Sequence, residues 1–261
     1  MSSRKRESWE IERSKRIYEL FVRTIGECTE LARELQFDKT HQWHMALVTL
    51  YGSILELSHA IRVQIANDSP IGVPILLRSQ LEAFVDFVNL AADRKYGYRI
   101  DAANLKEWKR VLIEAKTIDN PYLKDIAEFK DLDAAMAEHE LKLTELEEKG
   151  YHALNNFEKF DRSGQAQEYR SFYNFLCCHT HNNMRALIER HIAFIDDGAD
   201  LEVQFFAPAV LTDLMEYYDS AAGILVAATI GIHEVLESGK RPEAKALSEN
   251  LQVLRKPWAN P

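Results

Sequence analysis

The chain has 261 residues, of which 46% are hydrophobic and 28% charged, a composition typical of globular proteins and unlike that of disordered or fibrous ones. Its formal net charge of −9 excludes a general electrostatic attraction to nucleic acid or to an anionic membrane surface. The length is compatible with one large domain or two small ones.

Apolar residues recur at the helical period along most of the chain, and there are only 10 Gly and 7 Pro to interrupt them. The pattern predicts long helices over about 6–35, 39–66, 73–95, 101–117, 166–195 and 209–237. Asp38 and Thr40 are the candidate caps of the second of these helices. A short extended piece is predicted within 196–208. We therefore expect an all-α fold, a bundle of long antiparallel helices.

One segment is more polar and more interrupted than the rest and contains a charged helix that ends at Gly150. We interpret this segment as a charged helical insertion that leaves the core. The expected organisation is a single helical domain over 1–261, with core helices at about 6–95 and 166–237, the insertion at about 119–165 and a C-terminal tail at 238–261.

The number of cysteines and the apolar runs bear on the cellular compartment of the protein. There are three cysteines, Cys28, Cys177 and Cys178, which is an odd number, and the start "MSSRKRES" lacks the apolar region of a secretory signal. No stretch approaches the roughly 18 apolar residues of a membrane span, and the apolar run at 221–232 is typical of a buried helix. We expect a cytoplasmic protein with reduced thiols that does not enter a membrane.

The stretch "FYNFLCCHTHNN", residues 172–183, concentrates polar groups in a helix that is apolar nearly all round and is therefore expected to be central. His179 projects among apolar neighbours, and we interpret it as a core histidine bonded to a nearby carbonyl or side chain. His181 projects to the opposite side, where Tyr173 and Arg185 also lie. His181 is therefore the stronger candidate for a functional group.

A second polar stripe follows one face of the helix predicted at 73–95. It consists of Arg78, Glu82, Asp86, Asn89 and Asp93. The simplest interpretation is a solvated face with ion pairs between successive turns, each contributing a few tenths of a kcal/mol.

The segment "LLRSQLEAFVDFVNLAAD", a charged helix and then "YNFLCCHTHNN" together resemble an uncharacterised family of helical bacterial proteins. That family pairs an Arg-x-x-x-Glu helix with a late Tyr-x-x-Leu-small-x-x-x-His helix. The resemblance covers roughly 45–195, and the matching residues are Arg78, Glu82, Tyr173, Leu176, Cys177 and His181. Cys177 stands where the family usually has Ser. The resemblance implies that Arg78, Glu82 and His181 share one polar pocket.

The first functional hypothesis rests on this pocket. The guanidinium of Arg78 offers a planar fork of donors, Glu82 can orient it, and His181 can titrate near neutral pH. Such a group can bind an anion or a phosphodiester, or lock two helices together. We expect an interaction or regulatory protein with a protein partner or a homodimer interface, and we associate it with bacterial stress or phage-defence systems.

The alternative hypothesis is a metal-independent ribonuclease. "RALIERH" places five residues between Arg185 and His191, which is distantly similar to the Arg–His motif of the all-α HEPN ribonucleases. In that family His transfers protons and Arg stabilises phosphate charge, usually at a site composed across a dimer. Ala186 follows Arg185 where the family usually has a polar residue. RNA is an expected partner only in this alternative, and a solvated position of both residues is the competing interpretation.

A metal site is the weakest of the three. Glu56 and His59 have the Glu-x-x-His spacing of carboxylate-bridged di-metal bundles, and Glu82, His181 and Glu216 are conceivable further ligands. A second Glu-x-x-His is missing from the two late helices. The sequence also lacks a Gly-rich phosphate loop, a dinucleotide-binding pattern and a Gly-x-Ser-x-Gly elbow. We therefore predict neither a metal nor a cofactor.

Overall fold

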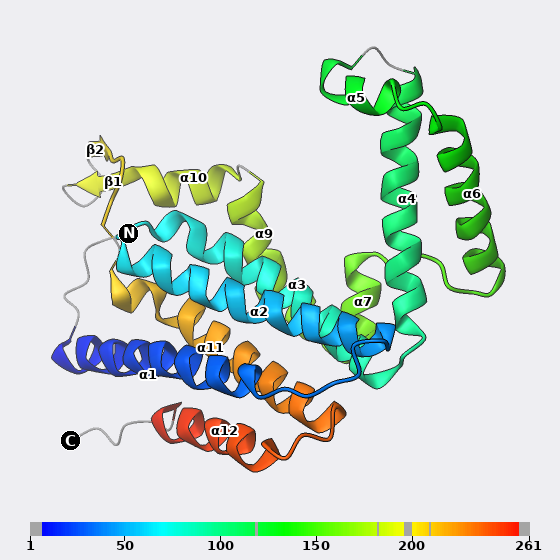
Figure 1. Cartoon of the computed structure of the whole chain (residues 1–261). Coiled ribbons are helices and arrows are strands. Elements are labelled where there is room, and N and C mark those ends of the chain that lie inside the picture. Colours follow the sequence, from blue (N-terminus) through cyan, green and yellow to red (C-terminus); the bar gives the residue numbers. More distant parts are fainter. Residues whose placement is uncertain (1–6, 118–119, 182, 196–199, 209, 256–261) are drawn as a thin grey trace.

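Long helices form the main bundle in the computed structural model, which describes residues 7–117, 120–181, 183–195, 200–208 and 210–255 (Figure 1). The bundle consists of α1 (Ser8–Arg33), α2 (Gln42–Ala66), α3 (Val73–Ala92), α11 (Leu211–Val235) and α12 (Arg241–Arg255). The predicted all-α class is confirmed, and four of the predicted helices match α1, α2, α3 and α11 to within a few residues. No helix in the described ranges is long and apolar enough to cross a membrane.

The start of α2 differs slightly from the predicted caps. His41 is the N-cap residue, while the Asp38 carboxylate accepts a hydrogen bond of 2.8 Å from the backbone N–H of Thr40 and one of 2.6 Å from its hydroxyl. Asp38 and Thr40 therefore stabilise the turn that leads into the helix rather than its first N–H groups.

The core lies where α11 packs against α1, α2 and α3. One hydrogen-bond network there links three helices: the Tyr51 hydroxyl donates to the Cys28 carbonyl at 3.2 Å and lies 3.1 Å from the Thr229 hydroxyl. At Gly231 a Cβ atom would come within 2.9 Å of the Phe87 ring, so the absence of a side chain lets α11 approach α3.

A helical arm projects from the bundle (Figure 1). It consists of α4 (Tyr96–Thr117), the short turn η2 (Pro121–Leu123), α5 (Lys124–Ala127) and α6 (Leu132–Glu148). Apolar residues such as Leu112 and Leu143 are buried between α4 and α6, and Lys109 pairs with Glu140. The arm begins at Tyr96, earlier than the insertion predicted at 119–165.

The chain returns from the arm through α7 (Asn156–Arg162), which lies within the predicted insertion but packs on α3. Asn89 Nδ2 donates to the Lys159 carbonyl at 2.9 Å, and Lys159 Nζ lies 3.0 Å from an Asp86 carboxylate oxygen. Part of the polar stripe on α3 therefore binds α7 and is not a solvated face.

The single helix predicted over 166–195 is wrong. The chain forms α8 (Ala166–Glu168), the π-helical turn η3 (Tyr169–Tyr173), α9 (Asn174–Thr180), α10 (Met184–His191) and strand β1 (Ile192–Ile195). The helix stops at His181, and Asn183 caps α10 by accepting a hydrogen bond of 3.0 Å from the N–H of Arg185. The residues of β1, "IAFI", favour a strand because most of them are β-branched or aromatic.

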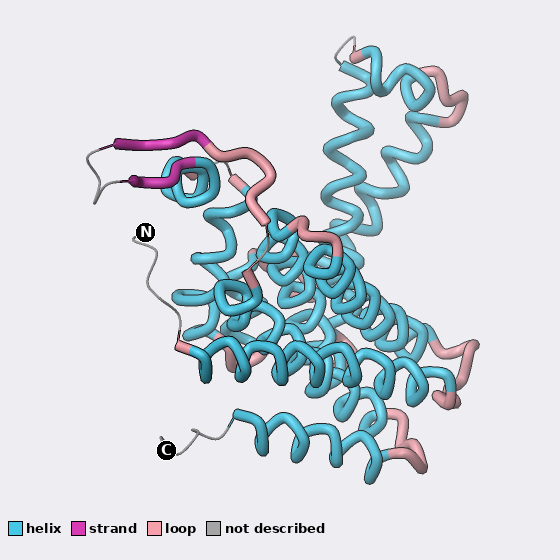
Figure 2. The backbone as a smooth tube through the Cα atoms, turned by 90° about the vertical axis from the view of Figure 1, so that its left-hand side faces the viewer, coloured by secondary structure: helices cyan, strands magenta, loops and turns pink. Residues whose placement is uncertain are grey.

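Strand β2 (Asp200–Val203) pairs antiparallel with β1 and contains the extended piece predicted within 196–208, of which 196–199 lie outside the described residues. Figure 2 shows this hairpin at the edge of the molecule beside α10. The predicted tail at 238–261 contains α12, and 256–261 also lie outside the described residues.

Candidate functional site

Arg78 and Glu82 lie one turn apart on α3, as predicted, and form an ion pair of 3.0 Å. Their side chains are 22% and 34% exposed, so the pair is only partly solvated and differs from the exposed pairs on the arm. The apolar residues around them in the sequence, such as Leu77 and Leu81, are buried and fix this face of α3 against the bundle. The pair therefore faces the returning segment rather than bulk water.

Tyr173, from the π-helical turn η3, completes this pair. Its buried hydroxyl donates to Glu82 at 2.6 Å and accepts from Arg78 Nη2 at 3.1 Å. Asn156 of α7 also donates to the Tyr173 hydroxyl at 2.6 Å, and Arg78 Nη1 donates to the Thr180 hydroxyl at 3.3 Å. These residues, Arg78, Glu82, Asn156, Tyr173 and Thr180, are called the polar cluster below.

The electrostatics of the polar cluster favour a fixed protonation state. Burial and the hydrogen bond to Glu82 raise the pKa of Tyr173 above its usual value, so its hydroxyl stays protonated and can donate. Burial opposes the charge of Arg78, but Tyr173 and Glu82 more than offset this and raise the Arg78 pKa. The cluster therefore joins α3, α7 and η3 through a shared hydrogen-bond network, although Arg78 Nε is buried without a partner among the described groups.

His181 lies at the C-terminus of α9 with an exposed side chain. No hydrogen bond joins it to Arg78 or Glu82 in the part of the chain that the structure describes. The reason is the end of the helix at Thr180: beyond it, His181 no longer follows the face that carries Tyr173. The resemblance identified Tyr173, whereas Asn156 and Thr180 had no signal in the sequence.

Arg185 and His191 are at opposite ends of α10 and do not share a face. Arg185 is exposed and pairs with Glu189 at 3.0 Å. His191 Nδ1 donates to the Gln204 carbonyl at 3.2 Å, and its ring lies 5.8 Å from that of Phe205. The two residues of the Arg–His motif are therefore not brought together within one copy of the chain.

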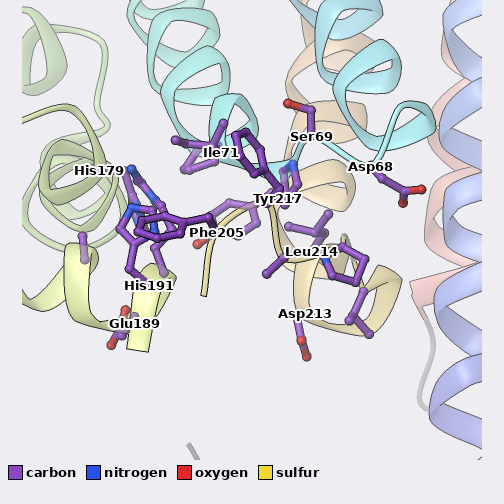
Figure 3. A pocket seen from close by; sticks show the side chains of 18 residues that line it. Asp68, Ser69, Ile71, His179, Glu189, His191, Phe205, Asp213, Leu214 and Tyr217 are labelled. Atoms are coloured by element: carbon purple, nitrogen blue, oxygen red, sulfur yellow. The ribbon is translucent and has the colours of Figure 1, made fainter. Parts of the chain in front are cut away.

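A cavity of about 470 Å³ lies beside His191 (Figure 3). His179 of α9 and Arg190 of α10 line it as well, and Tyr217 of α11 closes the facing wall. The Nε2 atom of His179 is buried without a hydrogen-bond partner among the described groups, contrary to the prediction of a bonded core histidine. Sequence reasoning missed this cavity because its walls come from segments far apart in the chain.

The hairpin exposes one wholly apolar face. The cross-strand pairs Ile192–Val203 and Phe194–Leu201 share it, whereas Asp200 and Glu202 belong to the pairs of the other face. Neighbouring apolar side chains of α10 and the connector are also exposed. We call the following residues, which are exposed except for the half-buried Ile192, the hairpin surface: Met184, Ile188, Ile192, Phe194, Leu201 and Val203.

The residues considered as metal ligands do not gather. Glu56 and His59 are exposed on α2, and Glu216 is exposed on α11. Across the described ranges, no three His, Cys, Asp or Glu side chains are grouped so that they could hold a metal ion.

The comparisons with known proteins bear on the family. The model of a family of unknown function, DUF5677, matches residues 44–200, which are more than half of the chain. Searches of curated proteins and of solved structures find no match. The matched segment contains the polar cluster and α10. The resemblance to an uncharacterised family is thereby confirmed, and the chain belongs to DUF5677, a family of unknown function.

Proposed function

We propose that the protein is a helical interaction module that associates with a second copy of itself through the hairpin surface. The observation that carries the proposal is the exposed apolar face of a two-stranded sheet whose β1 strand, "IAFI", has no charged residue or proline. The edge strand of a two-stranded sheet can pair with a strand of another chain when no charge or proline prevents it. A contiguous exposed apolar surface also favours association between chains.

The placement of the hairpin carboxylates is compatible with a second copy as the occupant. Two chains with a net charge of −9 repel each other, and the acidic residues of the hairpin, Asp200 and Glu202, lie on the face opposite the apolar one. A two-fold contact through the apolar face keeps these carboxylates apart and brings identical apolar side chains together. A regulatory role in a bacterial stress or defence system, in the cytoplasm, belongs to the same proposal.

Phe194→Lys is expected to weaken self-association by roughly thirtyfold, the equivalent of about 2 kcal/mol, because it places a charge in the apolar contact. Sedimentation equilibrium over a wide concentration range measures the change. Leu141→Lys is the matched control, since Leu141 is 62% exposed on α6, away from the hairpin. A wild-type protein that stays monomeric, or equal effects of the two substitutions, contradicts the proposal.

A second candidate is metal-independent cleavage of RNA, which is favoured by the convergence of His179, His191 and Arg190 on one cavity. Two imidazoles beside a guanidinium offer proton transfer and a cation for phosphate charge. The Arg–His motif lies on α10, which also contributes to the hairpin surface, so a dimer would bring two copies of it near each other.

For this candidate, His191→Ala is expected to lower cleavage of a labelled RNA in the absence of divalent metal by about a hundredfold or more. Arg185→Ala has the same effect if the Arg–His motif is the site, whereas Arg190→Ala has it if the cavity is the site. Wild-type protein without cleavage, or cleavage unaffected by His191→Ala, removes the candidate.

A further inference from the structure

The cavity beside His191 has two chemically different sides. Figure 3 shows His179 and His191 on one side, Leu214 and Tyr217 on the other, and Phe205 between them. The first side comes from α9 and α10, and the second from the start of α11 together with η1 (Pro70–Gly72) and the start of α3. A ligand can therefore make polar contacts at one end and apolar contacts at the other.

The side formed by α9 and α10 carries one arginine, Arg190, and one glutamate, Glu189. Arg190 has no ion pair in the described part of the chain, whereas Glu189 pairs with Arg185 of the same helix. Burial, and then the charge of Arg190, lower the pKa of His179, while the charge of Glu189 acts in the opposite direction. The positive charge of Arg190 therefore acts on a residue that lines the cavity, His179.

The hydrogen-bonding groups on this side are not used up within the protein. His191 Nδ1 donates to the Gln204 carbonyl, so the Nε2 of the neutral ring is an acceptor that can take a hydrogen bond from a ligand. The Nε2 of His179 is buried and has no partner among the described groups. An unpaired buried nitrogen costs free energy, and a ligand oxygen that accepts from it would recover that cost.

The facing wall is apolar and partly aromatic. Ile71, Pro74, Val210 and Leu214 line it, and the ring of Tyr217 lies perpendicular to that of His179 with centroids 6.4 Å apart. A volume of about 470 Å³ is in the usual range of small-molecule sites. Flat apolar groups fit such a wall because rings prefer edge or offset contacts with other rings.

Acidic residues are present at the rim. Asp68, Glu189 and Asp213 also line the cavity, but Figure 3 shows their carboxylates directed away from its centre. Glu189 is in addition engaged by Arg185. Among the charged residues that line the cavity, Arg190 is therefore the one that can attract an anion to its centre, beside the two histidines.

We propose that this cavity binds a small organic anion, a carboxylate or phosphate group joined to a flat apolar body. The anionic group lies against Arg190 and the Nε2 of His179, and the body packs on Leu214 and Tyr217. This site is distinct from the hairpin surface and from the polar cluster, and its ligand goes beyond the self-association proposed above.

The test measures binding of three naphthalene probes by isothermal titration calorimetry. 2-Naphthoate and 2-naphthyl phosphate carry the two anionic groups on one body, and 2-naphthamide is the neutral counterpart. We expect at least one anion to bind about tenfold more tightly than the amide. The tighter of the two anions identifies whether the natural ligand is a carboxylate or a phosphate.

Variants locate the binding. Arg190→Gln is expected to weaken binding of the anion by about tenfold, while Arg110→Gln, which changes an exposed arginine of α4 that does not line the cavity, leaves it unchanged. Phe194→Lys is also expected to leave it unchanged, which separates this proposal from self-association. Absence of binding, equal binding of the amide, or equal effects of the two arginine substitutions overturns the proposal.

An NMR titration of His179 gives a second readout at the same position. Binding of an anion is expected to raise the pKa of His179, because the anion offsets the charge of Arg190. A His179 resonance that titrates identically with and without a bound anion also overturns the proposal.

Discussion

Arg78→Met is expected to lower the free energy of unfolding by about 2 kcal/mol at pH 7. The substitution keeps an unbranched apolar stem but leaves the Glu82 carboxylate and the Tyr173 hydroxyl without their cation. Partial exposure of the pair, 22% and 34%, lets water replace part of the lost interaction and keeps the effect below that of a fully buried pair. Urea unfolding followed by circular dichroism measures it.

Arg110→Met is the matched control for this experiment. Arg110 forms an ion pair with Glu107 on α4, but the two side chains are 75% and 67% exposed. Pairs of this kind contribute between zero and about 0.5 kcal/mol. Equal losses of stability in the two variants would show that the polar cluster does not hold α3 and η3 together.

His233→Leu is expected to raise the free energy of unfolding by about 1–2 kcal/mol at pH 8. His233 of α11 is fully buried, and neither ring nitrogen has a hydrogen-bond partner among the described groups. Leucine has a similar volume and no polar atoms to leave unsatisfied. Thermal or urea unfolding at pH 8 measures the difference from wild type.

The same substitution is expected to flatten the acid limb of the stability profile. Burial lowers the pKa of His233, although the charges of Glu243 and Glu34 act in the opposite direction. Below about pH 6.5 this histidine binds a proton in the unfolded chain, whereas in the folded protein it stays neutral until the pH reaches its lowered pKa. The free energy of unfolding therefore falls as the pH drops towards that lowered pKa. His233→Leu loses this contribution and therefore loses less stability between pH 6.5 and pH 5.

His59→Leu is the control for the pH profile, because His59 is exposed on α2. Its acid limb is expected to match that of wild type. A His233→Leu profile that runs parallel to wild type from pH 8 to pH 5 would mean that burial of His233 does not contribute to the acid sensitivity.

The bundle could be predicted from the sequence because the spacing of apolar residues along a helix shows which of its faces is buried. The helices α1, α2, α3 and α11 each present long apolar faces, and nothing within them competes with the helix. The segment 166–195 misled the same reasoning. Its apolar residues continue across the break, which has one local and one non-local cause: Asn183 caps a new helix, and "IAFI" is a strand because it pairs with β2. Such pairing depends on residues that periodicity within one window does not include.

The candidate sites could be predicted only in part for a related reason. Arg78 and Glu82 are neighbours on one helix, so their contact follows from spacing alone. Tyr173 is 95 residues from Arg78, and only the family resemblance joined the two. His179, Arg190 and Tyr217 meet through the fold, across two breaks in regular structure, and no spacing rule connects them.

The π-helical turn η3 lets this segment take up one residue more than an α-helix would need between the same two faces. Its hydrogen bonds run from residue i to i+5, so the extra residue is held within a single turn. Loss of one residue between Tyr169 and Tyr173 would restore α-helical hydrogen bonds without turning α9 about its axis, because the π turn had already absorbed that residue. The rings of Tyr169 and Tyr173, which stack at 5.1 Å, would however no longer be four positions apart. A single-codon deletion here is therefore expected to disturb the stacked tyrosines while sparing the packing of α9.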